Sequence, residues 1–226
     1  MCGRYNVIDS PEVRQLMEIV GVKLDGIRWS RDVSPASTIS IVRESEDGRG
    51  LADATWWLLL DRDTLKPSKY TSFNTRSDKL GTPRSAGYRP YRQSRCFIPA
   101  SAFIEGLGDK QTYHKIELDG QAIAFGGLYQ EYVNRDTGEA AIGASIITLP
   151  PPREWADIHP KSMPMMLPVD DTSTLDAWLD PGVTDVERFE WLLTPEIRDD
   201  QLLTPIGKPS QWNEIGETFR LPRSSQ

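Results

Sequence analysis

The chain has 226 residues, and its apolar content of 38% is sufficient for a packed core. The formal net charge of −7 excludes a uniformly basic protein that coats nucleic acid, so any contact with a polyanion must use a local basic patch. Cys2 and Cys96 are too few for a disulfide framework, which fits a reducing compartment. Because there are also only two histidines, we expect no metal site, and we predict no cofactor.

No stretch approaches the ~18 uninterrupted apolar residues of a membrane-spanning helix. The first residues also lack the basic segment and apolar run of a secretory signal. We therefore expect a cytoplasmic protein with no membrane partner.

A cysteine, Cys2, directly follows the initiator methionine. Cysteine is small enough for the initiator methionine to be removed, which would leave a free α-amine and a thiol on one residue. The α-amine has a pKa near ~8 and is a usable nucleophile at neutral pH, whereas a thiol, with a pKa of about 8.5, needs neighbours to ionise. Such a 1,2-aminothiol can condense with an aldehyde and then close a five-membered thiazolidine ring. The alternative is that Cys2 is an incidental residue of a disordered terminus.

Residues 10–21 are predicted to form the first helix. Ser10 is a good N-cap, and Pro11 suits the first helical position. Gly21 can end the helix. Four apolar residues recur at helical spacing and would share one face of this helix, which we expect to face the core. They are Val13, Leu16, Met17 and Val20.

Residues 38–42 and 54–60 are predicted to be strands, with the charged segment 44–49 as the tip of a hairpin between them. We expect Trp56 and Trp57, in the second strand, to pack in the core rather than to stack on bases.

The segment 61–95 is biased toward basic residues, and Tyr88 and Tyr91 lie among them. This composition is typical of a groove for single-stranded nucleic acid, in which charges follow the backbone and rings stack on bases. The alternative is a solvated basic loop. The basic residues are Arg76, Lys79, Arg84, Arg89, Arg92 and Arg95.

The segment 96–106 is apolar except for Glu105 near its end. A carboxyl group in apolar surroundings has a raised pKa, which suits a general acid or base. Alternatively, Glu105 marks the point at which a strand emerges into solvent. Cys96 is expected to pack as a small hydrophobic residue.

Further strands are predicted over 112–118, 122–132 and 141–149. The first two are predicted to form a hairpin around the turn Asp119-Gly120. The pair Gly126-Gly127 inside the second strand indicates a bulge or a close backbone approach.

His159 lies between an acidic turn and a predicted short strand. Histidine is the natural proton carrier near pH 7, and the alternative is a hydrogen-bonded histidine near the core. We expect His114, on a strand, to be structural.

Helices are predicted over 172–179 and 185–193, followed by a polar tail. Many short strands with few helices and no repeat predict an α+β protein, a single β-rich domain over 1–226. Within it, residues 200–226 would form a tail that wraps the surface.

Five blocks occur in order along the chain. They are Met1–Tyr5, Asn74–Asp78, Arg95–Glu105, Gly127–Tyr129, and Ile158-His159 followed by Met163-Pro164. Together they resemble the pattern of the SOS-response-associated peptidase (SRAP) family, and the ordered set is far more specific than any one block. The resemblance implies antiparallel sheets in a barrel-like core with flanking helices.

The resemblance also implies covalent capture of abasic sites in single-stranded DNA, whose open-chain deoxyribose offers an aldehyde. Cys2 would supply the amine and the thiol once Met1 has been removed, a step that family members are inferred to catalyse themselves. Asn74 would orient the amine and thiol. Glu105 would protonate the ring oxygen to open the sugar and later assist reversal of the crosslink, and His159 would shuttle protons.

The DNA contacts follow from the same resemblance. Arg4 and Arg76 would hold flanking phosphates, which positions a strand without reading its bases. Pro35, Arg84 and Lys161 are further predicted contacts. The expected partner is single-stranded DNA with an abasic site, bound by a monomer that would be nucleoid-associated and would shield the lesion.

The chain departs from the family pattern at three places. The loop around Pro35 lacks the family's tyrosine, and the segment 65–67 replaces a tryptophan-rich loop that wedges DNA in some members. The arginine that follows the family's histidine becomes Lys161 or Ser162, and lysine can replace a phosphate contact but not a bidentate one.

Two other functions remain open at this stage. The first is an N-terminal cysteine amidase or peptidase for other substrates, which turnover of free peptides would favour. The second is a non-catalytic binder of single-stranded DNA, whose binding would weaken steeply with salt and would not depend on Cys2.

Overall fold

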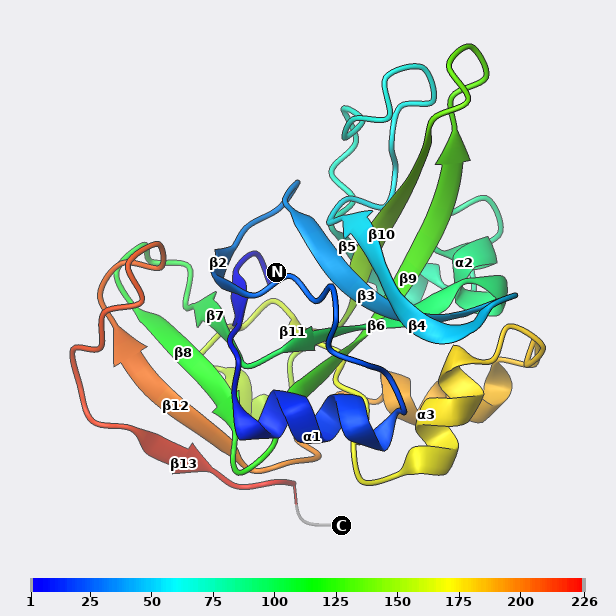
Figure 1. Cartoon of the computed structure of the whole chain (residues 1–226). Coiled ribbons are helices and arrows are strands. Elements are labelled where there is room, and N and C mark those ends of the chain that lie inside the picture. Colours follow the sequence, from blue (N-terminus) through cyan, green and yellow to red (C-terminus); the bar gives the residue numbers. More distant parts are fainter. Residues whose placement is uncertain (1, 225–226) are drawn as a thin grey trace.

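The structure is a computed structural model that describes residues 2–224. Within this range the chain forms two strand-rich parts with helices packed around them (Figure 1).

The first part is a closed barrel of five strands. Strand β3 pairs with β4 and β6, β6 pairs with β9, β9 pairs with β10, and β10 returns to β4, which closes the circle. Two short strands, β5 (Asn74–Arg76) and β11 (Met163–Pro164), are added along β10. The barrel strands are β3 (Thr38–Ser45), β4 (Gly48–Thr55), β6 (Arg95–Ala100), β9 (Ile123–Val133) and β10 (Ala140–Leu149).

The second part is an antiparallel sheet with the strand order β13-β12-β8-β7-β1-β2. Its strands are β1 (Tyr5–Val7), β2 (Ser30–Val33), β7 (Ala102–Gly106), β8 (Tyr113–Leu118), β12 (Gln201–Ile206) and β13 (Phe219–Leu221). These observations confirm the predicted α+β class with a barrel-like core.

The two parts are joined through Ser101, the single residue between β6 and β7. Every residue of β6 is buried, which is typical of a strand covered on both faces. The aromatic rings of Tyr5, Phe103 and Phe125 pack edge to face at this junction, with centroids 5.4 and 6.0 Å apart. Strand β7 therefore leaves the packed junction directly and carries Glu105 with it.

Helix α1 (Pro11–Ile19) begins as its sequence predicts. The Ser10 hydroxyl accepts a hydrogen bond from the Val13 amide, and Pro11 occupies the first turn. The other helices are α2 (Tyr88–Gln93) and α3 (Thr172–Leu179), with short 3-10 segments η1 (Ser77–Lys79), η2 (Arg153–Trp155) and η3 (Glu187–Leu193). The helix predicted over 185–193 is thus a 3-10 segment.

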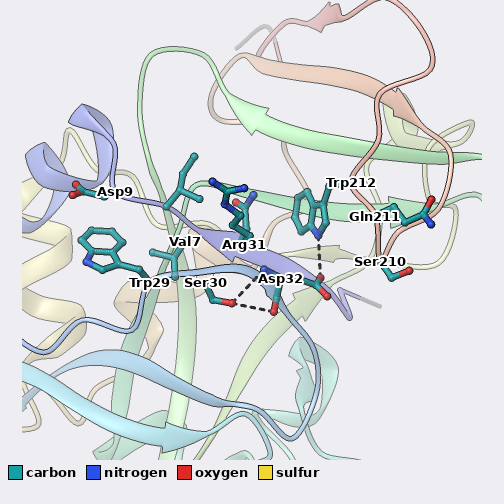
Figure 2. Close-up of a pocket in the computed structure, with 11 residues that line it drawn as sticks. Val7, Asp9, Trp29, Ser30, Arg31, Asp32, Ser210, Gln211 and Trp212 are labelled. Atoms are coloured by element: carbon teal, nitrogen blue, oxygen red, sulfur yellow. Dashed lines mark hydrogen bonds between the residues drawn. The ribbon is translucent and has the colours of Figure 1, made fainter.

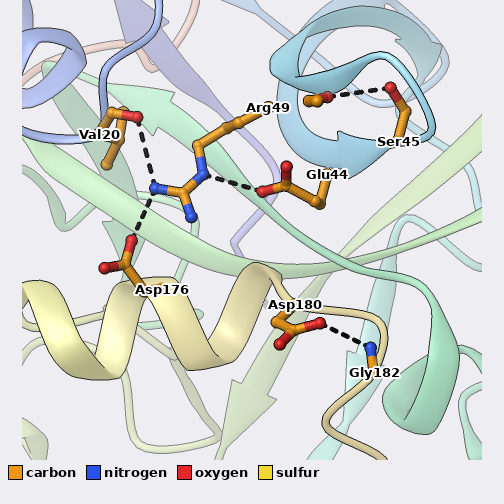
Figure 3. A network of polar contacts seen from close by, with 8 residues as sticks. Val20, Glu44, Ser45, Arg49, Asp176, Asp180 and Gly182 are labelled. Carbon is orange, nitrogen blue, oxygen red and sulfur yellow. Dashed lines mark hydrogen bonds and ion pairs between the residues drawn. The ribbon is translucent and has the colours of Figure 1, made fainter.

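Two arginines fasten helices to the barrel. Arg49 on β4 binds the Val20 carbonyl after α1, Glu44 on β3 and Asp176 on α3 (Figure 3). Arg95 on β6 is 3% exposed and donates to four carbonyl oxygens around α2 and α3, those of Tyr91, Trp178, Asp180 and Val183. Because a buried guanidinium must satisfy its donors, Arg95 fixes both helices against the barrel.

The predicted hairpin around Asp119-Gly120 is reduced to a single antiparallel bridge between Leu118 and Gln121. Gly120 does turn with a φ of 74°, but β8 pairs with β7 and β12 in the second sheet, whereas β9 pairs with β6 and β10 in the barrel. Their burial explains this difference: β8 alternates between buried and half-buried residues, and the first seven residues of β9 are all buried. The two strands therefore belong in different environments.

Two other boundaries differ from prediction. Of the strand predicted over 54–60, only Ala54 and Thr55 lie in β4, which begins at Gly48. The chain then leaves the sheet, and the Trp56 indole N–H donates to the Phe73 carbonyl. The predicted surface tail includes β12, which lies between β8 and β13 with Gln201 fully buried. Its first part is therefore a sheet strand and does not wrap the surface.

The close backbone approach predicted at Gly126-Gly127 is confirmed. A Cβ at Gly126 would lie 1.9 Å from the terminal methyl of Met165, and one at Gly127 would lie 3.0 Å from the Cys96 sulfur. Both glycines stay in register with β6, so no bulge is needed. Cys96 is fully buried, as expected of a small hydrophobic residue.

None of the helices within residues 2–224 is long and apolar enough to cross a membrane.

Gly143 provides a test of the barrel closure. A Cβ there would lie 2.5 and 2.6 Å from the carbonyl oxygens of Trp57 and Leu58, which are backbone atoms and cannot move aside alone. We expect Gly143→Ala to lower the free energy of unfolding by about 1–3 kcal/mol, measured by urea denaturation. Gly50→Ala is the matched control, because a Cβ at Gly50 meets nothing within 4 Å. Equal effects of the two substitutions would contradict this packing.

Candidate active site

Cys2 lies in the interior, with a fully buried side chain. The strand that follows it, β1, pairs with β2 on one side and with β7 on the other. The Ile104 amide donates to the Arg4 carbonyl at 2.9 Å, so the antiparallel pairing extends beyond β1 toward the chain start. Continuing this register places Glu105 beside residues 2 and 3.

Asn74 approaches Cys2 from the barrel. Strand β5 is held parallel to β10, with Asn74 opposite Ile146. The Asn74 side chain donates from Nδ2 to the backbone oxygen of Cys2 at 2.7 Å. Its Oδ1 atom is buried and has no hydrogen-bond partner among residues 2–224.

Glu105 and His159 form the acid–imidazole pair of the site. His159 Nδ1 lies 3.6 Å from Glu105 Oε2 and 2.5 Å from the Gly106 carbonyl oxygen. A carbonyl oxygen only accepts, so Nδ1 carries the proton and the other ring nitrogen, Nε2, is the basic one. The His159 amide donates to the Trp155 carbonyl at 2.9 Å, which fixes the histidine after η2.

Burial favours the neutral form of each titrating group in this site. It raises the pKa of Glu105 to about 8 and lowers the pKa of His159 below its usual value. It also raises the pKa of the Cys2 thiol well above its usual value, and the charge of Glu105 acts in the same direction. At neutral pH the site therefore holds a protonated carboxylic acid, a neutral imidazole and a thiol.

The structure thus brings together the four predicted catalytic residues, which come from the chain start, β5, β7 and the loop after η2. An acid that is protonated at neutral pH can donate a proton, and the adjacent neutral imidazole can accept one. Glu105 does not mark the emergence of a strand into solvent, because it is 3% exposed.

The two predicted phosphate-binding arginines lie beside this group. Arg4 uses one nitrogen, Nη1, to bind both carboxylate oxygens of Asp32, at 2.6 and 2.5 Å. Arg76 shares the strand face of Asn74, since they are two residues apart on β5, and its exposed side chain pairs with Asp78. Exposed pairs of this kind contribute little to stability, so phosphate can compete for Arg76.

The other three residues predicted to contact DNA are less closely connected to the four candidate catalytic residues than Arg4 and Arg76 are. Lys161 is exposed, and its charge helps to lower the pKa of His159, so it lies near the imidazole. Pro35 is half-buried in a turn against the backbone of Trp56. Arg84 is exposed in the loop before α2, and no contact among the described residues joins it to the four.

The basic segment 76–95 is only partly available to a ligand. Arg95 and Tyr91 are buried, which removes both from any surface groove. Arg92 stacks on Tyr88 with its guanidinium 3.9 Å from the ring centroid and donates to two backbone carbonyls. Composition alone therefore overstated this segment as a nucleic-acid groove.

Asp32 is a further residue near the site that the sequence pattern does not single out. It is the partner of Arg4 and also accepts a hydrogen bond from the indole of Trp212, at 3.0 Å. No sequence signal joins residues so far apart, because the contacts depend on the pairing of β1 with β2.

A similar fold occurs in solved structures. A protein from Bacteroides thetaiotaomicron matches with a TM-score of 0.67 and 20% identity, over 85% of this chain and 86% of its own. A protein from Bordetella bronchiseptica matches at 0.65 and 16%, over 100% of both chains. A phage-related protein from the same organism matches at 0.61 and 19%, over 98% of this chain and 93% of its own. At these identities the likeness shows the fold alone.

The sequence shows the family. The profile of the SOS response associated peptidase (SRAP) family matches residues 1–208, and the chain belongs to this family. Family membership supports a function associated with DNA damage. No curated protein matches the chain.

The raised pKa of Glu105 predicts a pH dependence of stability. The folded pKa of about 8 is higher than the value near 4.5 of a free glutamate, so the folded protein holds a proton that the unfolded chain loses. The contribution of Glu105 to the free energy of unfolding should therefore fall as pH rises from about 4.5 to about 8. Glu105→Gln removes this loss, and its stability relative to wild type should rise by roughly 2–4 kcal/mol across the window, at about 1.4 kcal/mol per pKa unit.

Urea denaturation at a series of pH values measures this difference. Glu46→Gln, in the exposed turn between β3 and β4, is the control and should follow the wild-type curve. A constant difference between Glu105→Gln and wild type from pH 5 to 8 would mean that Glu105 is already ionised at low pH.

Proposed function

We propose that this protein captures abasic sites in single-stranded DNA as a covalent thiazolidine on Cys2. The observation that carries the proposal is the convergence of Asn74, Glu105 and His159 on the buried start of the chain. These residues supply an amide, a carboxylic acid and an imidazole around a single cysteine, and such groups can orient an aminothiol and transfer the protons of aldehyde capture.

The first step is removal of Met1, catalysed by the site itself. Water adds to the carbonyl carbon between Met1 and Cys2, the peptide bond breaks, and the α-amine of Cys2 takes up the proton. The basic nitrogen of His159 and the acid of Glu105 supply proton transfer for this hydrolysis. Asn74 Nδ2 holds the Cys2 backbone, and its buried Oδ1 accepts a hydrogen bond from the new amine.

The second step exposes the aldehyde of the lesion. The closed deoxyribose opens when its ring oxygen is protonated, and Glu105 donates this proton. A carboxyl group with a pKa of about 8 still carries its proton at neutral pH, whereas a free glutamate would not.

The third step forms the crosslink in two stages. The Cys2 amine adds to the aldehyde and a water molecule leaves, which gives an imine. The Cys2 sulfur then adds to the imine carbon as its proton passes through His159 to the imine nitrogen, and the five-membered ring closes. The balance is one aldehyde and one aminothiol giving one thiazolidine and one water.

This order of events follows from the electrostatics of the site. The Cys2 thiol is held neutral by burial, so it is a weak first nucleophile. The amine therefore reacts first. The sulfur of the same residue then needs to move only a short distance to reach the imine carbon. Glu105 would also assist reversal, in which the ring reopens to the imine and water then hydrolyses the imine, so that the amine and the aldehyde of the strand are regenerated.

The DNA is held by cations around this site. Arg4 retains Nε and Nη2 for a phosphate while Nη1 is bound to Asp32. Arg76 and Lys161 add contacts on either side, with Pro35 and Arg84 further out. Such contacts hold any sequence, which suits a site that has no base to read. The protein would act as a monomer that shields the lesion on single-stranded DNA, and would associate with the nucleoid while bound.

A crosslinking assay tests this proposal. We expect wild-type protein to give a heat-stable shifted band with a single-stranded oligonucleotide that contains one abasic site. Cys2→Ala should abolish the heat-stable band, because the variant keeps an α-amine but lacks the sulfur that closes the ring, and an open imine is hydrolysed on heating. Cys96→Ala is the matched control, since Cys96 is equally buried but lies on β6, and it should retain the band.

The same assay separates the alternatives. An equal band with Cys2→Ala would contradict capture by Cys2. Turnover of free peptides without a band would support an amidase, and salt-sensitive binding without a band would support a non-catalytic DNA binder.

A further inference from the structure

A pocket of about 780 Å³ lies on the second sheet, and none of the four candidate catalytic residues lines it. Its walls come from β1, from β2 with the residue before it, and from residues 210–212 (Figure 2). Trp29 and Trp212 lie on opposite sides of it in Figure 2, with Arg31 between them.

On one wall of the pocket, the Trp29 side chain is exposed to solvent and the backbone beside it is held in place. The Trp29 side chain is 39% exposed. The residue before it, Arg28, donates its amide to the Ser40 hydroxyl at 2.9 Å and binds Asp53 through two nitrogens, at 2.7 and 2.6 Å. The indole is therefore presented at the pocket from an anchored chain segment.

The Trp212 side is held in an unfavourable backbone conformation. Trp212 has a φ of 54°, a region that bulky residues rarely adopt. The Asn213 side chain and backbone bind the amides of Lys208 and Gly207, and the Trp212 amide donates to the Lys208 carbonyl at 3.2 Å. Strain that is fixed in this way by its surroundings is typical of ligand sites, and it leaves the indole pre-organised.

Asp32 connects this pocket to the candidate active site. It accepts from the Trp212 indole on one side and from Arg4, two residues after Cys2, on the other. Its charge is thereby compensated, and that of Asp9 is compensated by Arg14 at 2.6 Å. Arg31, in contrast, makes no ion pair with the residues that the structure describes. The pocket therefore offers two aromatic faces and one available cation.

We propose that this pocket receives an unpaired nucleobase next to the lesion, stacked on the indoles of Trp29 and Trp212. This inference rests on the proposed function, because it places the base on the strand whose phosphate Arg4 holds. Stacking on aromatic rings tolerates every base, since each has a π face. Arg31 adds a guanidinium that stacks or binds phosphate, and Gln211 adds an amide for hydrogen bonds. The pocket thus provides the stacking surface that the segment 65–67 lacks.

Binding to strands that cannot react tests this inference. The probes are two fluorescent single strands with a tetrahydrofuran lesion, which has no aldehyde. One has ordinary bases beside the lesion, and in the other the neighbouring nucleotides also lack bases. We expect wild-type protein to bind the base-bearing strand roughly tenfold more tightly by fluorescence anisotropy, the effect of stacking about one base.

Substitutions test whether the preference for the base-bearing strand depends on the two tryptophans of the pocket. The double variant Trp29→Ala/Trp212→Ala should bind both strands as weakly as wild type binds the base-free strand. Trp191→Ala is the matched control, because Trp191 is 44% exposed on η3 outside the pocket, and it should keep the preference. If the double variant does not fold, the single variant Trp29→Ala, at an exposed position, should show a smaller reduction of the preference for the base-bearing strand.

The outcomes separate this inference from the proposed function. Equal wild-type affinity for the two strands, or an unchanged preference in the tryptophan variants, overturns the base pocket even where aldehyde-bearing DNA is still crosslinked. A preference lost in those variants supports it, and because the probes carry no aldehyde this reading holds whether or not capture occurs.

Discussion

The pairing of the chain's first strand on both sides is the constraint on which the candidate site depends. Strand β1 lies between β7 and β2, and Asn6 adds a further bond by accepting from the Ala102 amide through its side chain. The residues just before β1 are thereby drawn into the interior rather than left in solvent. Cys2 is buried for this reason, and the paired sheet fixes its position.

Burial then determines the chemistry that the site can perform. Desolvation raises the pKa of Glu105, lowers that of His159 and raises that of the Cys2 thiol. One physical cause thus produces a neutral acid, a neutral base and a protonated nucleophile within the same small volume. In the capture that we propose, the same burial would let Glu105 donate a proton at neutral pH and would make the sulfur a poor first nucleophile, so the amine would begin the reaction.

The parts of this structure that follow from local sequence were predictable. The cap at Ser10 and the apolar face of α1 defined that helix, and the apolar run before Glu105 predicted a buried strand. The placement of Glu105 beside His159 came from the family resemblance, because nothing local joins β7 to the loop after η2. Long-range pairing explains the errors as well: a favourable turn at Gly120 does not decide whether two strands share a sheet, and a basic composition does not reveal that Arg95 is buried.

The central claim is that Cys2 becomes the first residue and that both its nitrogen and its sulfur join the sugar. Mass spectrometry of the purified protein, before and after reaction with an abasic oligonucleotide, tests this claim directly. The account predicts a chain without Met1 that gains one oligonucleotide less one water, with the adduct mapped to Cys2 and no free thiol there. Capture by a chain that retains Met1, or an adduct mapped to a lysine, would contradict it.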